Sequence, residues 1–469
     1  MIIDQIKLYH LLPYPLKVLL ASAKGYFLYH QRYGPHTQQL VEEASERESW
    51  KATRWDDWQH SKLERILHLA ATQVPYYRAY WDKQRSLGDR SSFYDLNNWP
   101  VLTKNEVRKN PTAFLCDGVN TNRLYEEHTS GSTGMPLRLW IKFDDLGKWY
   151  ALFICRWLEW YGQVLGRNWG VIGGQQVAAF DRTKPPYWVW NWSGKQLYLS
   201  CYHISLDNAR HYLTAIKNHN LKYMVVYPSA MYNLAYYLNQ FDLRSNSLKF
   251  ILSNAEPLYP YQKEMIEEVF NCPVYNSYGL AESIIGASEC VQGHALHLWP
   301  DAGVTENLAI NQDSPQEAGK PGRIIATGLI NTAMPLIRYE TGDIGIMNND
   351  NACKCGRKMP IINQITGRLA DCIVTKDGRL ISRLAHVTEA GLPIIEMQIV
   401  QESLERINVY VVSEQLLTTE HREKITDLIH QRVGDIPIVV KQVKHIKRSA
   451  NGKFRSVISK VNSQDFEMG

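Results

Sequence analysis

The amino-acid sequence predicts an α/β protein with a large N-terminal domain and a small C-terminal α+β domain. At 469 residues the chain is long enough for two or three domains, each with its own core. Between residues 101 and 367, short apolar runs that end in glycine, proline or serine alternate with helical segments, a pattern typical of α/β domains. The remaining stretch of about 100 residues has the size of one further compact domain.

The large domain divides into two parts. Residues 1–100 are expected to be mainly helical, because apolar residues recur at helical spacing in stretches such as Ser61–Thr72. Residues 101–367 form the core, in which runs such as Trp169–Ile172 and Phe250–Leu252 lead into loops. Ligands of open α/β sheets bind outside the carboxyl ends of the strands, so these loops are the expected binding site.

The C-terminal domain is expected to span residues 368–469, with its boundary at Thr366–Asp371. Apolar patterning predicts strands at Ile394–Val400, Arg406–Val412 and Ile436–Val440, and a helix near Thr419–Val433.

Composition excludes several classes of protein. The net charge of +5 is small and dispersed, and no basic stripe with interleaved aromatics predicts a nucleic-acid partner. No apolar run reaches the roughly 18–20 residues that span a bilayer. The N-terminus shows no signal-peptide pattern, so a cytoplasmic location is expected. Eight cysteines in such a chain do not indicate a disulfide framework.

The apolar stretch Leu11–Leu28 contains aromatic and lysine residues and has two interpretations. We favour a helix packed on the protein's own core. The alternative is an amphipathic helix that makes a weak contact with a membrane surface.

A loop rich in glycine and hydroxyl side chains, HTSGSTGMP, covers His128–Pro136. Its glycines allow close backbone approach, and its hydroxyl and backbone N–H groups can donate hydrogen bonds to phosphate oxygens. It is not a Walker A loop, because no GK[ST] ends it. The expected phosphate-binding residues are Thr129, Ser130, Gly131, Ser132, Thr133 and Gly134.

Five further motifs follow in order: SNAEPL (Ser253–Leu258), NSYGLAES (Asn276–Ser283), IRYETGDIG (Ile337–Gly345), TGRLAD (Thr366–Asp371) and RSANGKFR (Arg448–Arg455). The series resembles the core motifs of the adenylate-forming superfamily, and most closely its phenylacetate–CoA ligase-like branch, which includes capsular-polysaccharide ligases. The resemblance covers nearly the whole chain. It implies mixed sheets in the large domain and a mobile C-terminal domain. It also implies an ATP-dependent ligase that converts a carboxylic acid to an acyl-adenylate and transfers the acyl group to CoA or another acceptor.

The same resemblance implies a role for each site residue. Lys453 would bridge the acid and the α-phosphate, which suits a mobile ammonium as charge develops between them. Glu282 would help hold Mg²⁺, a cation that prefers oxygen ligands. The adenine site would be formed by Ala255, Glu256, Ser277, Tyr278 and Gly279, and the ribose and phosphate contacts by Asp343 and Arg368.

Two departures from the family pattern concern the acceptor. Ala370 stands where many relatives have the hinge aspartate, and Lys376–Arg383 matches the CoA-approaching loop poorly. Adenylate formation is therefore better supported than thioester formation. CoA is expected to be a poor acceptor with many acids, which favours an amine or a sugar-linked nucleophile, although CoA stays open.

Three cysteines and a histidine predict a structural zinc site. Cys353 and Cys355 form a tight thiolate pair, and Cys290 precedes two histidines, of which His297 is preferred over His294. A Cys₃His set would complete a closed tetrahedral shell. The alternative is ordinary reduced cysteines.

Two rival functions remain open. One is an amide- or ester-forming ligase of polysaccharide or secondary-metabolite biosynthesis, which would use the same adenylate. The other is a nucleotide-binding regulatory or scaffold protein without turnover. An aromatic content of 11 % suits an aryl acid as substrate, and the oligomeric state stays open between monomer and homodimer.

Overall fold

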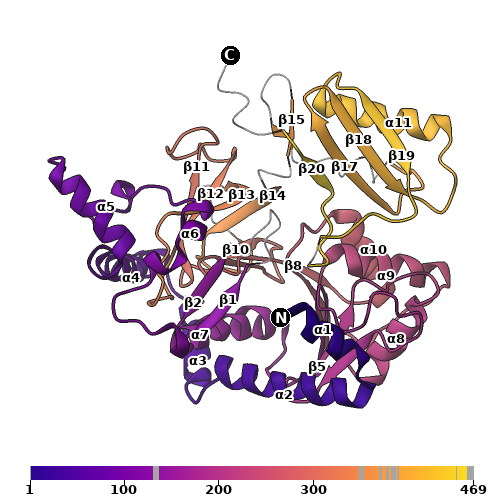
Figure 1. Ribbon diagram of the computed structural model, residues 1–469, viewed down its shortest axis with the longest axis horizontal. Helices are drawn as coiled ribbons and strands as arrows, with labels where there is room; N and C mark the ends of the chain where they lie inside the picture. Colours follow the sequence, from indigo (N-terminus) through magenta and orange to yellow (C-terminus); the bar gives the residue numbers. More distant parts are fainter. Residues whose placement is uncertain are drawn as a thin grey trace.

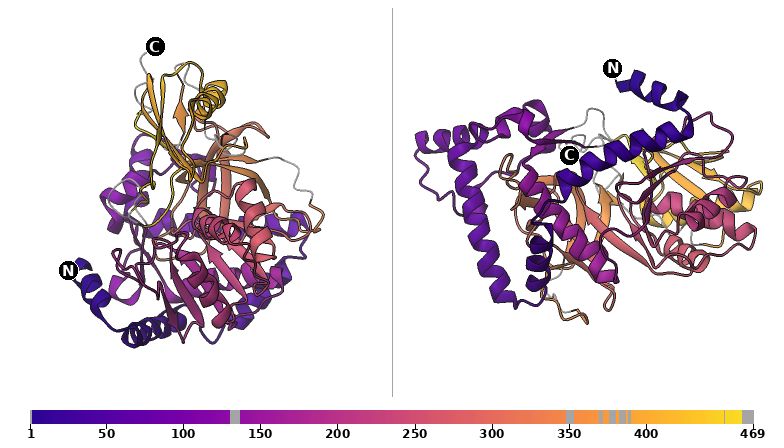
Figure 2. Two further views of the ribbon diagram at one scale, coloured as in Figure 1. Left: turned by 90° about the vertical axis from the view of Figure 1, so that its right-hand side faces the viewer. Right: turned by 90° about the horizontal axis from the view of Figure 1, so that it is seen from below.

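The structure is a computed structural model that describes residues 2–129, 137–347, 353–368, 372–375, 380–381, 387, 390–449 and 451–461. The predicted fold class is confirmed: a large α/β part with a mixed sheet is followed by a smaller α+β part (Figures 1 and 2).

Helices dominate the first 90 residues. The predicted helix at Ser61–Thr72 lies within a longer one, α4, while the Leu11–Leu28 stretch belongs to two helices that meet at Leu12–Pro13. Proline has no N–H to donate and is tolerated at a helix start, so the chain begins a new helix there. The helices are α1 (Ile2–Leu11), α2 (Tyr14–Arg32), α3 (Thr37–Arg47), α4 (Ala52–Gln73), α5 (Pro75–Ser86), α6 (Lys104–Lys109) and α7 (Phe143–Phe153).

A mixed sheet of 12 strands in the described part of the chain forms the centre of the large domain. A separate hairpin, β1 (Tyr125–His128) with β2 (Arg138–Ile141), leads into and out of the glycine-rich loop. The order across the main sheet is β11 (Gly303–Leu308), β12 (Pro321–Gly328), β13 (Tyr339–Met347), β14 (Ile361–Arg368), β10 (Leu296–Leu298), β9 (Gly286–Glu289), β8 (Val274–Gly279), β7 (Phe250–Ser253), β6 (Tyr223–Val226), β3 (Trp169–Gly173), β5 (Gln196–Ser200) and β4 (Trp188–Asn191).

The stretch β8-β7-β6-β3-β5 of this sheet is parallel, and its neighbours on both sides are antiparallel. Helices α8 (Ala209–Asn218), α9 (Pro228–Gln240) and α10 (Pro260–Phe270) follow the parallel strands and bury their apolar faces against them. Parallel strands all end at one edge, so the loops after β3, β6, β7 and β8 meet there. That edge carries the site described below.

The C-terminal part has its own apolar core, in which α11 (Thr419–Val433) covers a four-stranded sheet. The predicted helix and the strand β18 (Arg406–Val412) occur at the expected residues, whereas β17 (Glu396–Ser403) and β19 (Ile438–Gln442) each begin two residues later than predicted. The sheet is completed by β20 (Val457–Ser459), and β15 (Ile373–Val374) pairs with β16 (Leu380–Ile381). This part lies above α9 and α10 in Figure 1, while α2 runs along the opposite end of the molecule.

Among the described residues, none of the helices combines the length and the apolar character needed to cross a membrane.

Candidate functional site

The loop that carries Lys453 is docked against the carboxyl edge of the parallel strands. Its Asn451 carbonyl contacts the backbone of Gly174, directly after β3, so closely that a Cβ on Gly174 would collide with it. The hydroxyl of Tyr227, directly after β6, donates to the same carbonyl at 3.4 Å. The Lys453 ammonium lies 6.0 Å from the centre of the Tyr227 ring. The C-terminal loop is therefore seated where ligands of such sheets collect.

Lys453 is half-buried, and its pKa is lowered, chiefly by burial and then by the positive charge of Arg368. Lys104 lowers the pKa further, while the carboxylates of Glu256 and Asp343 act in the opposite direction. The charges that act on Lys453 thus come from residues far apart in the sequence, from Lys104 to Arg368. The site thus combines basic groups with carboxylates.

Asp343 is buried between two residues that the sequence also singled out. The Tyr278 hydroxyl donates to Asp343 Oδ2 at 2.8 Å, and Arg368 Nε lies 3.5 Å from Asp343 Oδ1. Asp343 and Arg368 are directly paired across β13 and β14. Burial, followed by the charge of Asp343, raises the pKa of Tyr278 well above its usual value, so the hydroxyl stays a neutral donor.

Glu282 is also buried, and its carboxylate is held by two residues that sequence reasoning missed. Lys104 Nζ donates to Glu282 Oε1 at 3.1 Å, and the Tyr339 hydroxyl donates to the same oxygen at 2.8 Å. Burial, and then the Glu282 charge, raise the pKa of Tyr339. The carboxylate is therefore fixed in place and kept close to a cation.

The Glu256 side chain accepts hydrogen bonds from two backbone N–H groups. Its Oε1 accepts from the backbone N–H of Phe454 at 2.6 Å, and its Oε2 accepts from the N–H of Ser229 at 3.1 Å. Ser229 lies at the start of α9 in the large domain, and Phe454 directly follows Lys453. Glu256 therefore joins the two domains. Burial raises the pKa of this carboxyl against the effect of these hydrogen bonds.

The same junction contains a second link. Arg448 forms an ion pair with Glu396 of β17, and its Nη1 donates to the Ser229 hydroxyl at 3.4 Å. Ser229 is thus held through its backbone by Glu256 and through its side chain by Arg448.

Both ends of the glycine-rich loop are fixed. Thr129 N–H donates to the Leu137 carbonyl, and Leu137 N–H donates to Thr129 Oγ1, each at 3.0 Å. Ser130, Gly131, Ser132, Thr133 and Gly134 lie outside the described residues, as do Ala370 and Asp371.

The remaining predicted adenine-site residues lie at the carboxyl ends of β7 and β8. Ser277 is buried, and its hydroxyl donates to the Ser253 carbonyl at 2.6 Å, which ties the two strand ends together. Gly279 is exposed at the end of β8. Ala255 is exposed and has a φ of 70°.

Backbone strain accompanies three of the site residues. Ala255, Ser283 and Arg338 have φ values of 70°, 55° and 46°, and they are the direct neighbours of Glu256, Glu282 and Tyr339. Non-glycine residues rarely adopt this left-handed region, and such strain, which costs on the order of 1 kcal/mol per residue, clusters at functional sites.

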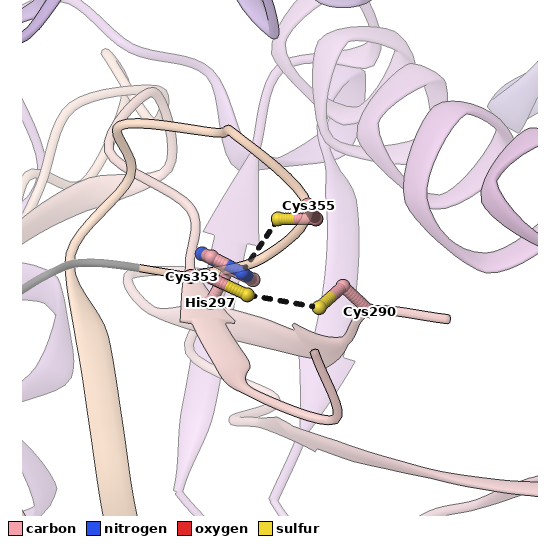
Figure 3. Close-up of side chains that lie close together, drawn as sticks. All are labelled: Cys290, His297, Cys353 and Cys355. Atoms are coloured by element: carbon pink, nitrogen blue, oxygen red, sulfur yellow. Dashed lines mark hydrogen bonds between the residues drawn. The ribbon is translucent and has the colours of Figure 1, made fainter. Parts of the chain in front are cut away.

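A second cluster lies apart from this site and contains Cys290, His297, Cys353 and Cys355, whose ligand atoms are all within 4.8 Å of one another (Figure 3). Cys290 Sγ is 3.5 Å from Cys353 Sγ, and Cys355 Sγ is 3.3 Å from His297 Nε2. Burial lowers the pKa of His297 to about 4, so the imidazole is neutral, the form that binds metals. His294 is exposed and contacts Glu289 instead, at 2.9 Å.

The fit of this cluster depends on Gly293 and on a buried charge network. A Cβ on Gly293 would collide with Cys353 Sγ. Arg357, two residues after Cys355, lies over the Trp160 ring and pairs with Glu48 at 2.7 Å. Glu48 also accepts from the buried Arg156 at 2.9 Å. Helix α3 and the cysteine loop are thereby joined.

Sequence reasoning missed Lys104, Tyr339, Gly174 and Tyr227 as members of the candidate site. Lys104 is 178 residues from its partner Glu282, and no local pattern relates such positions. Tyr339 did carry a signal, because it lies within the IRYETGDIG motif. The Gly173–Gly174 pair after a strand was likewise a visible sign of close backbone approach.

Comparison with protein families gives two matches. Residues 186–333 match the AMP-binding enzyme family, and residues 373–460 match the CapK C-terminal domain. Among curated proteins, the chain is 25 % identical over 410 residues to Protein CapK of Staphylococcus aureus, covering 86 % of this chain and 88 % of that protein. It is 23 % identical over 448 residues to a phenylacetate-coenzyme A ligase of Thermus thermophilus, covering 85 % and 95 %.

Solved structures agree on the fold. A 2-hydroxyisobutyryl-CoA ligase in the postadenylation state has a TM-score of 0.68 at 19 % identity, covering 88 % of this chain and 91 % of that one. The same ligase in its thioesterification state has a TM-score of 0.54 at 19 % identity, with the same coverage. Over most of its length the chain is therefore similar to adenylate-forming enzymes of the branch that contains phenylacetate-coenzyme A ligases and CapK, and its fold is theirs.

Proposed function

We propose that the residues gathered at the carboxyl edge of the sheet form an acyl-adenylate from a carboxylic acid and ATP. A carboxylate oxygen of the acid forms a bond to the α-phosphorus, and the bond from that phosphorus to the bridging oxygen breaks, releasing pyrophosphate. Both reactants are anionic, so the rate depends on positioning and on positive charge at the reacting oxygens. The position of Lys453 carries the proposal, because this half-buried ammonium lies beside the Tyr227 ring, near enough to Asp343, Arg368 and Glu256 for their charges to shift its pKa.

The other site residues bind and orient in this proposal. The Thr129–Gly134 loop holds the β- and γ-phosphates, Tyr278 lies against adenine, and Asp343 accepts hydrogen bonds from the ribose hydroxyls. Arg368 contacts the ribose and phosphate. Glu282 provides an oxygen ligand for Mg²⁺, which neutralises phosphate charge when bound. Lys104 and Tyr339 hold Glu282 in position for that role.

The proposed acceptor is CoA, whose thiol sulfur would attack the acyl carbon while AMP leaves. The named activities of the phenylacetate-coenzyme A ligases among the relatives support this acceptor. An amine or a sugar hydroxyl is the second candidate, favoured by Ala370 at the position of the usual hinge aspartate. Residues 368–469 are taken as the domain that turns between the two half-reactions. A zinc ion held by Cys290, His297, Cys353 and Cys355 would have a structural role, because four protein ligands leave no open position.

The test of adenylation is Lys453→Ala. Loss of one electrostatic stabiliser should lower ATP–pyrophosphate exchange with a substrate acid by roughly 100-fold or more. Binding of ATP should change little, because the lysine comes from the second domain. Lys444→Ala, an exposed lysine of the same domain, is the matched control and should exchange normally. Near-normal exchange by Lys453→Ala would refute the assignment.

A further inference from the structure

The outward face of α2 is apolar and uncovered. Leu16, Leu19, Leu20 and Phe27 are 46 %, 63 %, 48 % and 67 % exposed. Their spacing along the helix, together with the exposed Ala23, places them on one stripe rather than around the whole helix. Such a stripe normally faces the core, and here it faces away from it.

The opposite face of α2 is fixed to the β4–β5 hairpin. The Ser22 hydroxyl accepts from Trp192 N–H at 3.0 Å, and the Ser22 carbonyl accepts from the Ser193 hydroxyl at 2.9 Å. Gly25 approaches Asn191 so closely that a Cβ would collide with the amide. Rotating the helix to bury its leucines would break these contacts. The apolar stripe is therefore presented outward by the packing of the inner face.

Further exposed apolar side chains lie in α1 and in the turn that contacts α2. Leu8 and Leu11 of α1 are 64 % and 82 % exposed, and Trp192 beside Ser22 is 70 % exposed. Seven of the 17 exposed large hydrophobic residues in the described part of the chain lie in α1 and α2. Single exposed apolar residues are ordinary, but a concentration on one element indicates an interaction surface. We call this surface, formed by α1, α2 and Trp192, the N-terminal face.

The charge of this segment distinguishes between a protein partner and a membrane. Residues 1–41 contain Lys7, Lys17, Lys24 and Arg32 but a single acidic residue, Asp4. Lys7 and Lys24 are exposed, while Lys17 is buried. Protein–protein interfaces are depleted in lysine, whereas leucine, tryptophan and lysine on one helix are typical of segments that lie on anionic membranes.

We propose that the N-terminal face docks on an anionic lipid bilayer, with the α2 leucines at the boundary between headgroups and acyl chains. The helix would lie in the plane of the membrane, with Trp192 at headgroup depth. In Figures 1 and 2, α2 and the C-terminal domain are at opposite ends of the molecule, so the docked protein keeps that domain in water. The proposal does not depend on the identity of the acid or of the acceptor.

The experiment is flotation of the purified full-length protein with vesicles of phosphatidylcholine, with or without phosphatidylglycerol. We expect binding to the anionic vesicles and weak binding to the neutral ones. Leu16→Ser/Leu20→Ser/Phe27→Ser should lower partitioning by roughly tenfold or more, because it removes three inserted side chains. Lys7→Glu/Lys24→Glu should lower it by about fivefold or more, and raised salt should act in the same direction.

Controls separate docking from general stickiness and from misfolding. Leu87→Ser/Leu416→Ser changes two side chains that are 71 % and 85 % exposed elsewhere, and it should bind as the wild type does. All variants should keep the wild-type melting temperature, since each replaced side chain is exposed. Lipids brominated in the acyl chain should quench the tryptophan fluorescence of the wild type more than that of Trp192→Phe.

Two results would overturn the proposal. One is equal partitioning of the wild type and the triple serine variant. The other is a protein that ignores vesicles but dimerises in solution, with a dimer that the triple variant abolishes, because the N-terminal face would then be a contact between two copies.

Discussion

At the scale of single residues, two buried carboxylates of the candidate site accept hydrogen bonds from neutral tyrosine hydroxyls. Tyr278 and Tyr339 have raised pKa values, so each stays protonated and donates to a carboxylate, Asp343 and Glu282 respectively. Lys453 shows the opposite effect, because burial and Arg368 lower its pKa. The protonated lysine is the form that can neutralise a phosphate, so its titration should limit the reaction on the alkaline side.

This shift predicts the pH dependence of adenylation. ATP–pyrophosphate exchange should fall as the pH rises through the lowered pKa of Lys453, which lies below the usual lysine value of about 10.4. The arginine of Lys453→Arg stays charged throughout this pH range. The exchange that this variant retains should therefore not fall as the pH rises. Exchange rates measured across the alkaline range decide the point. An unchanged limb in the arginine variant would assign the titration to another group.

The cysteine cluster allows a prediction about metal content. Protein that has never contacted nickel resin should contain about one zinc per chain, and Cys353→Ser/Cys355→Ser should lose it together with several kcal/mol of unfolding free energy. Activity should fall through lost stability. Cys272→Ala, a buried cysteine outside the cluster, should keep its zinc and serves as the control. A metal-free wild type of equal stability would contradict the prediction.

At the scale of elements, the junction between the two domains depends on Glu256, which connects the start of α9 to the lysine loop. Glu256→Ala would leave the Ser229 and Phe454 N–H groups without this acceptor, each at a cost of about 1–3 kcal/mol where they stay buried. The docked arrangement should therefore become less populated. Helix α9 itself lies in the large domain and should keep its packing.

We accordingly expect Glu256→Ala to lower acyl-adenylate formation by roughly 10- to 100-fold, the range that 1.4–2.8 kcal/mol represents. The affinity for ATP should stay within about twofold of the wild type, since the Glu256 carboxylate faces backbone donors of both domains. Glu256→Gln keeps one acceptor oxygen and should be intermediate. Glu264→Ala on the exposed side of α10 is the control. A loss of ATP affinity equal to the loss of rate would assign Glu256 to the adenine site instead.

The sequence predicted elements well where one local signal decides them. Helix α11 begins directly after Thr418, whose side chain caps it, and the strand at Arg406–Val412 is rich in β-branched residues. The starts of β17 and β19 were harder to predict, because apolar residues already precede the positions at which strand pairing begins. The motif residues Asp343, Arg368 and Tyr278 meet in one place, as their shared resemblance implied. The contacts of Glu282 with Lys104, and of Glu256 with Phe454, could not be predicted, because they depend on how distant segments pack.

At the scale of the whole molecule, the position of the C-terminal part against the large domain determines what the lysine loop contacts. The lysine loop is docked on the large domain, where the Asn451 carbonyl meets Gly174 and accepts from the Tyr227 hydroxyl. The second half-reaction of the proposed function would require this docking to be released, with a hinge that absorbs the change in backbone angles.

The acceptor can therefore be tested separately from adenylation. With a confirmed substrate acid, ATP and Mg²⁺, AMP release should be followed while CoA is titrated. The relatives predict saturable production of acyl-CoA, whereas Ala370 predicts accumulation of the adenylate with little response to CoA. A panel of amines and amino sugars, supplied in place of CoA, identifies the acceptor in the second case.

The contact at Gly174 also has a consequence for how the reaction rate can vary. The backbone of Gly174 touches the backbone of Asn451, which precedes Lys453 by two residues. Only a hydrogen atom stands there in place of a side chain. A methyl group would act as a wedge and hold the lysine loop back by about 1 Å, a displacement that can cost roughly 100-fold in rate. In the proposed function, Gly174 would thus act as a spacer that sets how closely the lysine loop approaches the large domain. Selection for a slower or faster enzyme could act on that spacer while leaving every binding residue unchanged.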